Sequence, residues 1–526
     1  MNKTNESLSL ANPAPIGMSV KQKIGLGLGF TGLLISILPL FNVNFSGIAI
    51  WLSISLLLIV VGTLIYANAM YLKHPRGIKN NGVWFRSLTS RKGIVGWLTG
   101  IGLTVFYVLL YWFPEYLGLN AEGENGGIIA LFDPLSRILS GNPASQWFVY
   151  GTLYTIAILI FGYKFILKYH HNKYQIIRTL SVMFFQLAFA FLIPEFMARL
   201  NYPYYDLKNM WPLNYYFFYD YNIKGFLNSG TIGALMLVFG SASIFVISPI
   251  LTYFYGKRWY CSWVCGCGGM AETAGDPFRH LSSKKLSAWK LERWLIHLIL
   301  VFAVVMTIAV IYSFLGKNPD MSIISRSQFV WGLVIFLSAL LGIILYFKRK
   351  ELKKDARYAA IAILSIILIT LLMSYFSDGR KLFFISAYEL RKTYGFLIGA
   401  AFSGVIGVGF YPLLGNRIWC RFGCPMAAIL GIQQRLFSRF RITTNGGQCI
   451  SCGNCSTYCE MGIDVRAYAQ KGQNIVRASC VGCGICSAVC PRGVLKLENG
   501  KPSNRIKHDT VLLGNDVDLL SQLKQQ

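Results

Sequence analysis

The chain has 526 residues, of which 54% are hydrophobic and only 14% charged, and this composition excludes an ordinary soluble domain. The formal net charge of +28 is of a size often met in nucleic-acid-binding proteins. Because the Lys and Arg residues lie in short loops between apolar runs, and no basic–aromatic motif is present, we expect a membrane and no nucleic acid as partner.

Apolar runs of about 18–25 residues recur along the chain, and a helix of that length crosses a bilayer. They follow a polar segment, residues 1–23, that carries no cleavable signal pattern. The runs predict ten membrane-spanning helices, at 24–41, 47–72, 94–113, 147–167, 179–198, 230–255, 294–314, 328–347, 359–377 and 394–415. The predicted fold class is therefore mainly α, a polytopic helical membrane bundle.

The charges of the loops predict the orientation of the bundle. Loops 73–93, 168–178 and 348–358 are rich in Lys and Arg, whereas loop 114–146 carries four acids against one Arg. Since basic loops tend to remain in the cytoplasm, we expect both termini there and the helices in a bacterial inner membrane. The weak point is loop 378–393, which is assigned to the outside although it holds four basic residues.

Two features near the outer face each allow two interpretations. Loop 199–229 is rich in Tyr, Trp and Phe, which favours an aromatic belt at the membrane interface over the roof of a quinone pocket. Glu195 is interpreted as an interfacial acid paired with Arg199 one turn further on. The alternative for Glu195 is a proton relay at membrane depth.

Eight of the 13 cysteines form a C-x2-C-x2-C-x3-C motif that occurs twice near the C-terminus. This is the ligand spacing of a bacterial two-cluster ferredoxin, in which the fourth cysteine of each motif reaches the other cluster. By that rule the two [4Fe–4S] ligand sets are Cys449, Cys452, Cys455 and Cys490, and Cys480, Cys483, Cys486 and Cys459. Zinc sites or a disulfide knot fit this spacing less well. One departure is Glu460, which stands where the first motif often has Pro.

A second, shorter repeat, Gly-x-Arg-x-aromatic-Cys-x3-Cys, follows two spans in equivalent positions. Cys-x3-Cys at the start of a helix places both sulfurs on one face, and two such pairs would supply four thiolates. Four thiolates hold a further [4Fe–4S] cluster, copper or zinc, whereas the alternative is that these cysteines are buried structural residues. The candidate ligands are Cys261, Cys265, Cys420 and Cys424. Cys267 is an extra thiol without a counterpart in the second copy.

Several spans, two Cys-x3-Cys motifs and a two-cluster ferredoxin module together resemble the membrane polyferredoxins of the NapH/NosR type. The cytochrome oxidase assembly protein CcoG is a more distant resemblance. The resemblance covers roughly residues 230–500, and its motifs map onto Cys261, Cys265, Cys420 and Cys424. It implies electron transfer between a quinol pool or cytoplasmic donor and a membrane-linked or exported acceptor. This sequence departs from the family at Gly266, where the family has Pro, and the flavin-binding domain of the NosR type and the immunoglobulin-like domain of CcoG have no counterpart.

The predicted organisation is a polar N-terminus, a membrane region, a membrane core, a ferredoxin domain of α+β class and a polar tail, at 1–23, 24–229, 230–440, 441–500 and 501–526. We expect two [4Fe–4S] clusters, with a third cluster or another metal at the shorter repeat, and possible use of quinone. The expected function is electron transfer with a redox partner such as a ferredoxin, flavodoxin or oxidoreductase subunit. Whether the chain is an enzyme by itself stays open. The alternative function is a copper-handling or assembly factor for another membrane enzyme.

Overall fold

The computed structural model describes residues 18–41, 43, 46–72, 93–120, 124–318, 324–349, 352, 354–377, 381–500, 512–513 and 517–518. Nine helices in these ranges are long and apolar enough to cross a membrane, and they coincide with nine of the ten expected spans. They are α1 with η1 (Val20–Phe41), α2 (Ile48–Tyr71), α4 (Ile94–Trp112), α6 (Gln146–Lys168), α7 through η3 to α8 (Lys173–Arg199), α10 through η4 to α11 (Gly230–Tyr255), α14 (Leu286–Lys317), α15 (Arg326–Lys348) and α16 (Lys354–Ser377). The mainly α membrane fold is confirmed.

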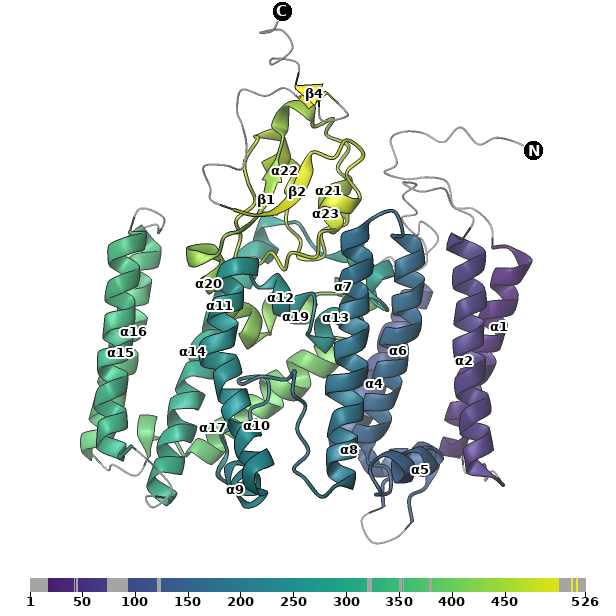
Figure 1. The fold of residues 1–526 in the computed structure, drawn as a ribbon, viewed down its shortest axis with the longest axis horizontal. Coiled ribbons are helices and arrows are strands. Elements are labelled where there is room, and N and C mark those ends of the chain that lie inside the picture. The colour runs from purple at the N-terminus through teal and green to yellow at the C-terminus, as the bar shows by residue number, and fades with distance from the viewer. Residues whose placement is uncertain are drawn as a thin grey trace, which may run out of the picture.

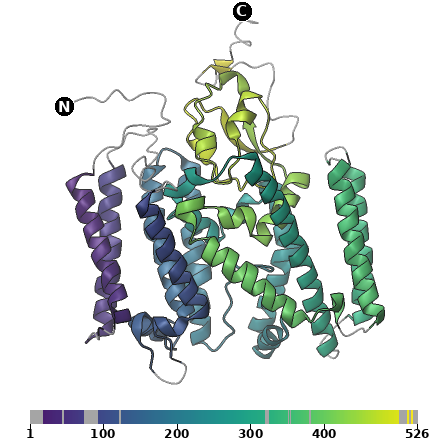
Figure 2. The ribbon, with the colours of Figure 1, turned by 180° about the vertical axis from the view of Figure 1, so that it is seen from behind.

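The tenth expected span, 394–415, is a broken and oblique helix. It consists of α17 (Ala387–Tyr394), the π-helical η8 (Gly395–Ile406) and, after a turn, α18 (Tyr411–Leu414). Figure 2 shows this segment slanting across the bundle, whereas most of the other long helices stand nearly parallel to one another. π-Helical turns also interrupt two straighter spans, at η3 (Phe185–Leu192) and η4 (Ser243–Ile247). Such turns occur frequently at functional sites.

The basic loops that the structure describes lie at the same end of the bundle as the C-terminal module. The turn between α6 and α7 and the C-terminal end of α15 are at that end, and α5 (Gly127–Leu139), in the acidic loop, is at the opposite end (Figure 1). The start of α1 also lies at the end that carries the module. Loop 73–93 lies outside the described residues, apart from Gly93.

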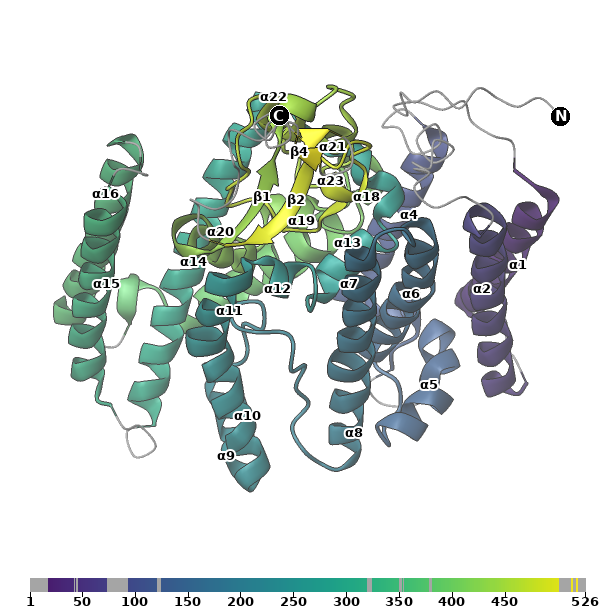
Figure 3. The same cartoon turned by 45° about the horizontal axis from the view of Figure 1, so that its top comes forward.

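Short helices form a layer between the bundle and the module. They are α12 (Arg258–Cys261), α13 (Gly266–Glu272), η5 (Asp276–Leu281), α19 (Ile418–Phe422) and α20 (Pro425–Phe437). Figure 3, in which the top of the molecule is turned forward, shows this layer beneath the module. Both copies of the Gly-x-Arg-x-aromatic-Cys-x3-Cys repeat therefore lie at the junction of the two parts.

The C-terminal module, residues 440–499, is closed by one antiparallel strand pair. β1 (Phe440–Thr444) pairs with β2 (Leu495–Asn499) from Phe440↔Asn499 to Thr444↔Leu495. Between the strands lie α21 (Asn454–Thr457), α22 (Val465–Gln470) and α23 (Ile485–Ala488). A further short pair, β3 (Leu512–Leu513) with β4 (Val517–Asp518), follows the module.

Between α8 and α9 (Asp220–Asn228), the chain turns back into the bundle instead of remaining at the interface (Figure 1). We call residues 200–219 the re-entrant segment. Its Trp211 donates a hydrogen bond to Thr307 Oγ1 on α14 at 2.8 Å, and Tyr394 on α17 donates to Pro212 O at 3.1 Å. The expectation of an aromatic belt is therefore wrong for the buried part of this loop, which includes Tyr205, Trp211 and Phe217, although Tyr204 and Tyr216 are exposed.

At the end of the bundle away from the C-terminal module, two charged residues differ from their expected roles. Arg391, one of the four basic residues of loop 378–393, is buried on α17, with its guanidinium 4.6 Å and 4.3 Å from the ring centroids of Tyr216 and Tyr219. It is held by aromatic rings and is therefore not a free loop charge of the kind that orients membrane proteins. Arg199 donates to the carbonyl oxygens of Arg137 and Ile138, and the expected pairing with the buried Glu195 is wrong.

Reporter fusions test the orientation in a bacterial host. Green fluorescent protein fused after Gln526 should fluoresce, because the module is expected in the cytoplasm, where clusters can be loaded. Alkaline phosphatase fused after Asn318, which follows α14 at the opposite end of the bundle, should be active. The reverse pattern, with phosphatase active at the C-terminus and inactive after Asn318, would contradict the predicted orientation.

Candidate iron–sulfur sites

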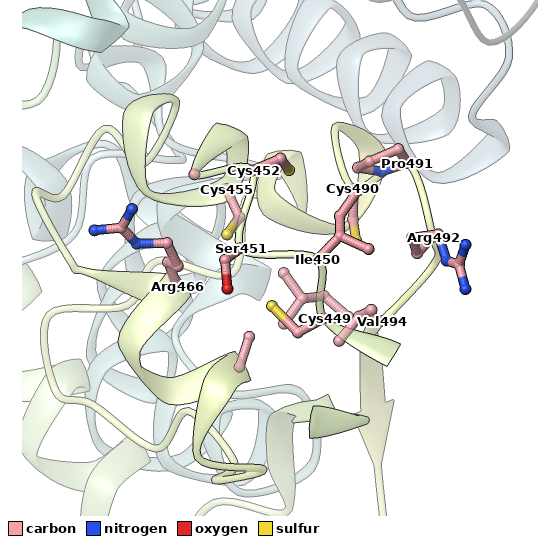
Figure 4. Close-up of a pocket in the computed structure, with 13 residues that line it drawn as sticks. Cys449, Ile450, Ser451, Cys452, Cys455, Arg466, Cys490, Pro491, Arg492 and Val494 are labelled. Atoms are coloured by element: carbon pink, nitrogen blue, oxygen red, sulfur yellow. The ribbon is translucent and has the colours of Figure 1, made fainter. Parts of the chain in front are cut away.

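One of the two expected ferredoxin ligand sets surrounds a single pocket. The four side chains of Cys449, Cys452, Cys455 and Cys490 line it, although the first three lie far from Cys490 in the sequence (Figure 4). Gly453, with φ 79°, precedes α21 in the left-handed conformation that glycine favours, and this turn brings Cys455 toward the pocket. Burial, followed by the nearby Cys490 thiol, raises the pKa of the Cys455 thiol to about 12.

The same pocket lies near exposed residues of the module. Ile450 is 55% exposed, and Pro491, Arg466 and Arg492 are exposed as well. Figure 4 shows the two arginines on opposite sides of the pocket. We call Ile450, Arg466, Pro491 and Arg492 the module face.

The second expected ligand set is also brought together, but against the membrane bundle. Burial, followed by the neighbouring thiols of Cys480 and Cys459, raises the pKa of the Cys486 thiol. Burial also raises the pKa of the Cys483 thiol, and the neighbouring Cys486 thiol acts in the same direction. The backbone N–H of Ile463 donates to Cys459 Sγ at 3.4 Å. Gly484, with φ 75°, begins α23 as Gly453 begins α21.

Backbone contacts hold this second set on the bundle. Gln434 on α20 donates to Cys480 O at 2.8 Å, Ser262 donates to Val481 O at 2.9 Å, and Gln175 on α7 donates to Cys483 O at 2.9 Å. Tyr174 donates to Gly482 O at 2.8 Å. The module thus meets the bundle through the Cys480 set, and the Cys449 set lies on the side of the exposed module face.

The four cysteines of the shorter repeat lie together in the layer between bundle and module. Burial raises the pKa of Cys424 well above its usual value, and the nearby thiols of Cys420, Cys261 and Cys265 act in the same direction. Arg417 Nη1 lies 3.6 Å from Cys420 Sγ, and Ala427 N lies 3.4 Å from Cys424 Sγ.

The two copies of the repeat share backbone geometry as well as sequence. Gly256 and Gly415, with φ 68° and 102°, each end a helix in a conformation that disfavours other residues. The π-helical segments that precede them, η4 and η8, end at Ile247 and Ile406, at equal sequence separations from Cys261 and Cys420. The internal repeat therefore extends from the cysteines back into the spans.

Buried ion pairs join the bundle to the module. Glu460, in the module, accepts from Arg279 Nη1 at 2.6 Å and lies 3.1 Å from Arg417 Nε. Arg417 also pairs with Glu272, which pairs in turn with Arg178. All five side chains are at most 4% exposed. Burial alone would raise the pKa of Glu460, but Arg279 and Arg417 hold it below its usual value. We call these five residues the ionic junction.

The ionic junction continues toward α6 and also contacts the second ligand set. Asp276 accepts from Arg279 Nε at 3.1 Å and from Lys168 Nζ at 2.5 Å. Ligand atoms of Glu272, Glu460 and Cys483 lie within 4.8 Å of one another, an arrangement that resembles a cation site. Because the two carboxylates are already paired with the guanidinium groups of the junction, we interpret the group as part of the ion-pair network.

The sequence analysis did not connect Glu272, Arg279 or Lys208 with the candidate sites. It counted Arg178 only among the basic residues of loop 168–178, whereas the structure buries Arg178 in an ion pair with Glu272. The composition did hold a signal for such ion pairs, because the chain has only 22 acidic residues but 50 Lys and Arg residues. An acid close to a cysteine repeat, such as Glu272, therefore has a surplus of cations with which to pair. The position of Glu460 in place of Pro was a second signal.

Comparisons with known proteins support iron–sulfur binding. A family described as a 4Fe-4S binding domain matches residues 237–287 and 397–443, which contain the two copies of the shorter repeat, and a 4Fe-4S dicluster domain matches residues 448–495. A protein of Escherichia coli (strain K12) described as putative electron transport protein YccM is 23% identical over 246 residues, covering 46% of this chain and 53% of that protein. The chain thus spans about half the length of that curated relative. No solved structure matches.

The residues at all three places fit iron–sulfur clusters. Each place gathers four thiol side chains, the ligands of [4Fe–4S] clusters, and backbone N–H groups donate to several of the sulfurs. Burial raises the pKa of the Cys424, Cys455 and Cys486 thiols, so cluster binding must displace their protons, whereas a hydrogen bond with Cys267 lowers the pKa of Cys265 to about 6.

The ionic junction predicts a large effect of Glu460→Gln. The change leaves Arg279 and Arg417 without their shared carboxylate, and breaking a buried pair in this way costs about 3–5 kcal/mol. We expect the module to lose its visible cluster absorption at a lower temperature and to be cleaved more readily by protease. The control is Glu498→Gln, on β2, where no buried ion pair is present. Equal thermal loss of cluster absorption and equal protease cleavage in the two variants would contradict the role of Glu460 in holding the module on the bundle.

Proposed function

We propose that this protein is a membrane-bound iron–sulfur electron-transfer protein that connects a soluble one-electron carrier with a quinone or a partner protein in the membrane. The arrangement of the three cysteine sets carries the proposal. The Cys449 set lies at the exposed module face, the Cys480 set lies at the ionic junction, and the Cys261/Cys420 set lies at the end of the spans that meets the module. The clusters supply one-electron exchange when bound.

The residues between the Cys480 set and the Cys261/Cys420 set hold these two sets close together. Arg417 contacts Cys420 Sγ with one nitrogen and Glu460 with another, and Glu460 follows Cys459 directly. Ser262, next to Cys261, binds the carbonyl of Val481, next to Cys480. A single layer of side chains therefore separates these two sets, which suits electron transfer without domain movement.

The module face fits an acidic ferredoxin or flavodoxin as the soluble partner. Arg466 and Arg492 flank the Cys449 pocket, and Ile450 supplies an exposed apolar contact. Basic residues around an apolar centre accelerate the encounter with an acidic partner and orient it. The sidedness that this requires, with the module in the cytoplasm of a bacterium, rests on the loop charges.

The metal content of anaerobically purified protein tests the number of sites. We expect about twelve irons and twelve acid-labile sulfides per chain, which correspond to three cubane clusters. The double variant Cys261→Ser/Cys420→Ser should retain about eight irons and the spectrum of the ferredoxin module.

Two other outcomes would overturn the third iron site. About eight irons in both proteins would limit the clusters to the module. Stoichiometric copper that disappears in the double variant would favour the copper-handling function, for which the extra thiol of Cys267 beside Cys265 is the specific observation.

Charge reversal tests the docking surface. Arg466→Glu together with Arg492→Glu should slow reduction by an acidic flavodoxin roughly tenfold or more at low salt, since steering by charge changes association rates by this order. The wild-type rate should fall as salt rises. Lys290→Glu, an exposed change on α14 outside the module, serves as the charge control. Equal rates for wild type and the double variant would refute docking at the module face.

A further inference from the structure

Two buried lysines flank the four membrane-face cysteines, and the function proposed above does not use them. Lys208 is 9% exposed and belongs to the re-entrant segment, whereas Lys257 is 1% exposed and belongs to the first copy of the repeat. They approach the cysteines from different parts of the chain. The second copy of the repeat has Asn416 where the first has Lys257, so this charge is not shared by the two copies.

Lys208 reaches the first cysteine pair from the side of the bundle. Its carbonyl accepts from the hydroxyl of Tyr260, next to Cys261, at 2.9 Å. Its ammonium donates to Gln186 Oε1 on η3 at 2.6 Å. A Cβ added to Gly266, directly after Cys265, would collide with Lys208 Nζ and lie 2.7 Å from Gln186 Oε1. Gly266, which replaces the Pro of the resembling family, thus leaves room for the ammonium.

Lys257 lies between the membrane-face set and the ferredoxin set that is nearest to it. Its backbone N–H donates to Gln434 Oε1 at 2.8 Å, and Gln434 also binds Cys480 O. Its Nζ lies 3.5 Å from the position that a Cβ on Gly431 would take, and Gly431 packs against Ala478. Burial raises the pKa values of the Cys261 and Cys480 thiols to about 12 and about 11, and Lys257 opposes both shifts.

Neither ammonium forms an ion pair with a carboxylate in the part of the chain that the structure describes. The nearby Asp206 accepts the backbone N–H of Lys208 at 3.1 Å. Lys168 and Arg417, by contrast, are both paired. A buried ammonium is unfavourable without negative charge nearby. Lys208 is attracted to the carboxylate of Asp206, and both lysines gain from a further negative group at the cysteines.

We propose that Lys208 and Lys257 are the fixed counter-charges of an anionic, thiolate-bound cluster at Cys261, Cys265, Cys420 and Cys424, and that they raise its reduction potential. The proposal rests on the function given above. A cubane held by four thiolates is net negative in both oxidation states and gains negative charge on reduction. A nearby positive charge favours the reduced form, because the attraction grows with the charge of the cluster.

The two lysines should differ in the number of cluster centres whose reduction potential they affect. Lys208 faces only the membrane-face set and should act on that centre alone. Lys257 lies between two sets and should act on both the membrane-face centre and the Cys480 centre. The ligand set at Cys449 lies at the opposite side of the module and provides an internal reference.

Redox titration of the purified full chain, followed by EPR, tests these roles. Lys208→Met should move the midpoint potential of the membrane-face centre to a more negative value and leave the others unchanged. Lys257→Met should move two centres in that direction. Gly266→Ala should move the potential of the membrane-face centre in the same direction by a smaller amount, because its Cβ displaces the ammonium but does not remove the charge. Lys290→Met is the exposed control.

Iron content separates the possible failures. About eight irons in the wild-type protein would refute the third cluster itself, and with it the function proposed for these cysteines. About twelve irons in every variant with unchanged potentials would overturn the role of the lysines alone. If Lys208→Met loses the cluster, Lys208→Arg should restore it, because the positive charge is retained. Equal loss in both variants would overturn the proposal.

Discussion

The structure depends on one carboxylate, that of Glu460, held between Arg279 and Arg417. These three side chains come from the ferredoxin module and from the layer of short helices between the module and the spans. A buried guanidinium needs a partner of opposite charge, and each arginine finds one across the boundary between the two parts. The ion pairs at this boundary are therefore as thoroughly buried as an apolar core. They fix the Cys480 set relative to Cys261 and Cys420.

Two departures from familiar sequence patterns have a common physical explanation. Glu460 follows Cys459 where Pro491 follows Cys490 in the second ferredoxin motif, and Gly266 follows Cys265 where Pro425 follows Cys424 in the second copy of the shorter repeat. In each case the replacement admits a charged group from a distant segment, Arg279 and Arg417 in the first and Lys208 in the second. The two copies of the cysteine repeat are alike in backbone but unlike in charge, so a pseudo-symmetric scaffold holds an asymmetric electrostatic environment.

Much of this arrangement could be predicted from the sequence, because hydropathy and cysteine spacing are local properties. Nine spans follow directly from apolar runs, while the tenth is broken by the π-helical η8 and crosses the bundle obliquely. The re-entrant segment could not be predicted, since Trp211 and Phe217 suit a membrane interface as well as a buried loop. The ionic junction could not be predicted either. Arg178, Glu272 and Glu460 are far apart in sequence, and only the fold shows that they meet.

The chain order of the ionic junction has a consequence for biogenesis. Arg178, Glu272 and Arg279 are synthesised with the earlier spans, and Arg417 and Glu460 come near the end of the chain. Until Glu460 has been made, Arg279 and Arg417 lack the carboxylate that they share in the finished protein. The charges at this boundary are therefore balanced only when the ferredoxin module is present. A chain that stops before Glu460 would keep the pairs of Arg279 with Asp276 and of Arg417 with Glu272, but it would lack the carboxylate that joins these two arginines.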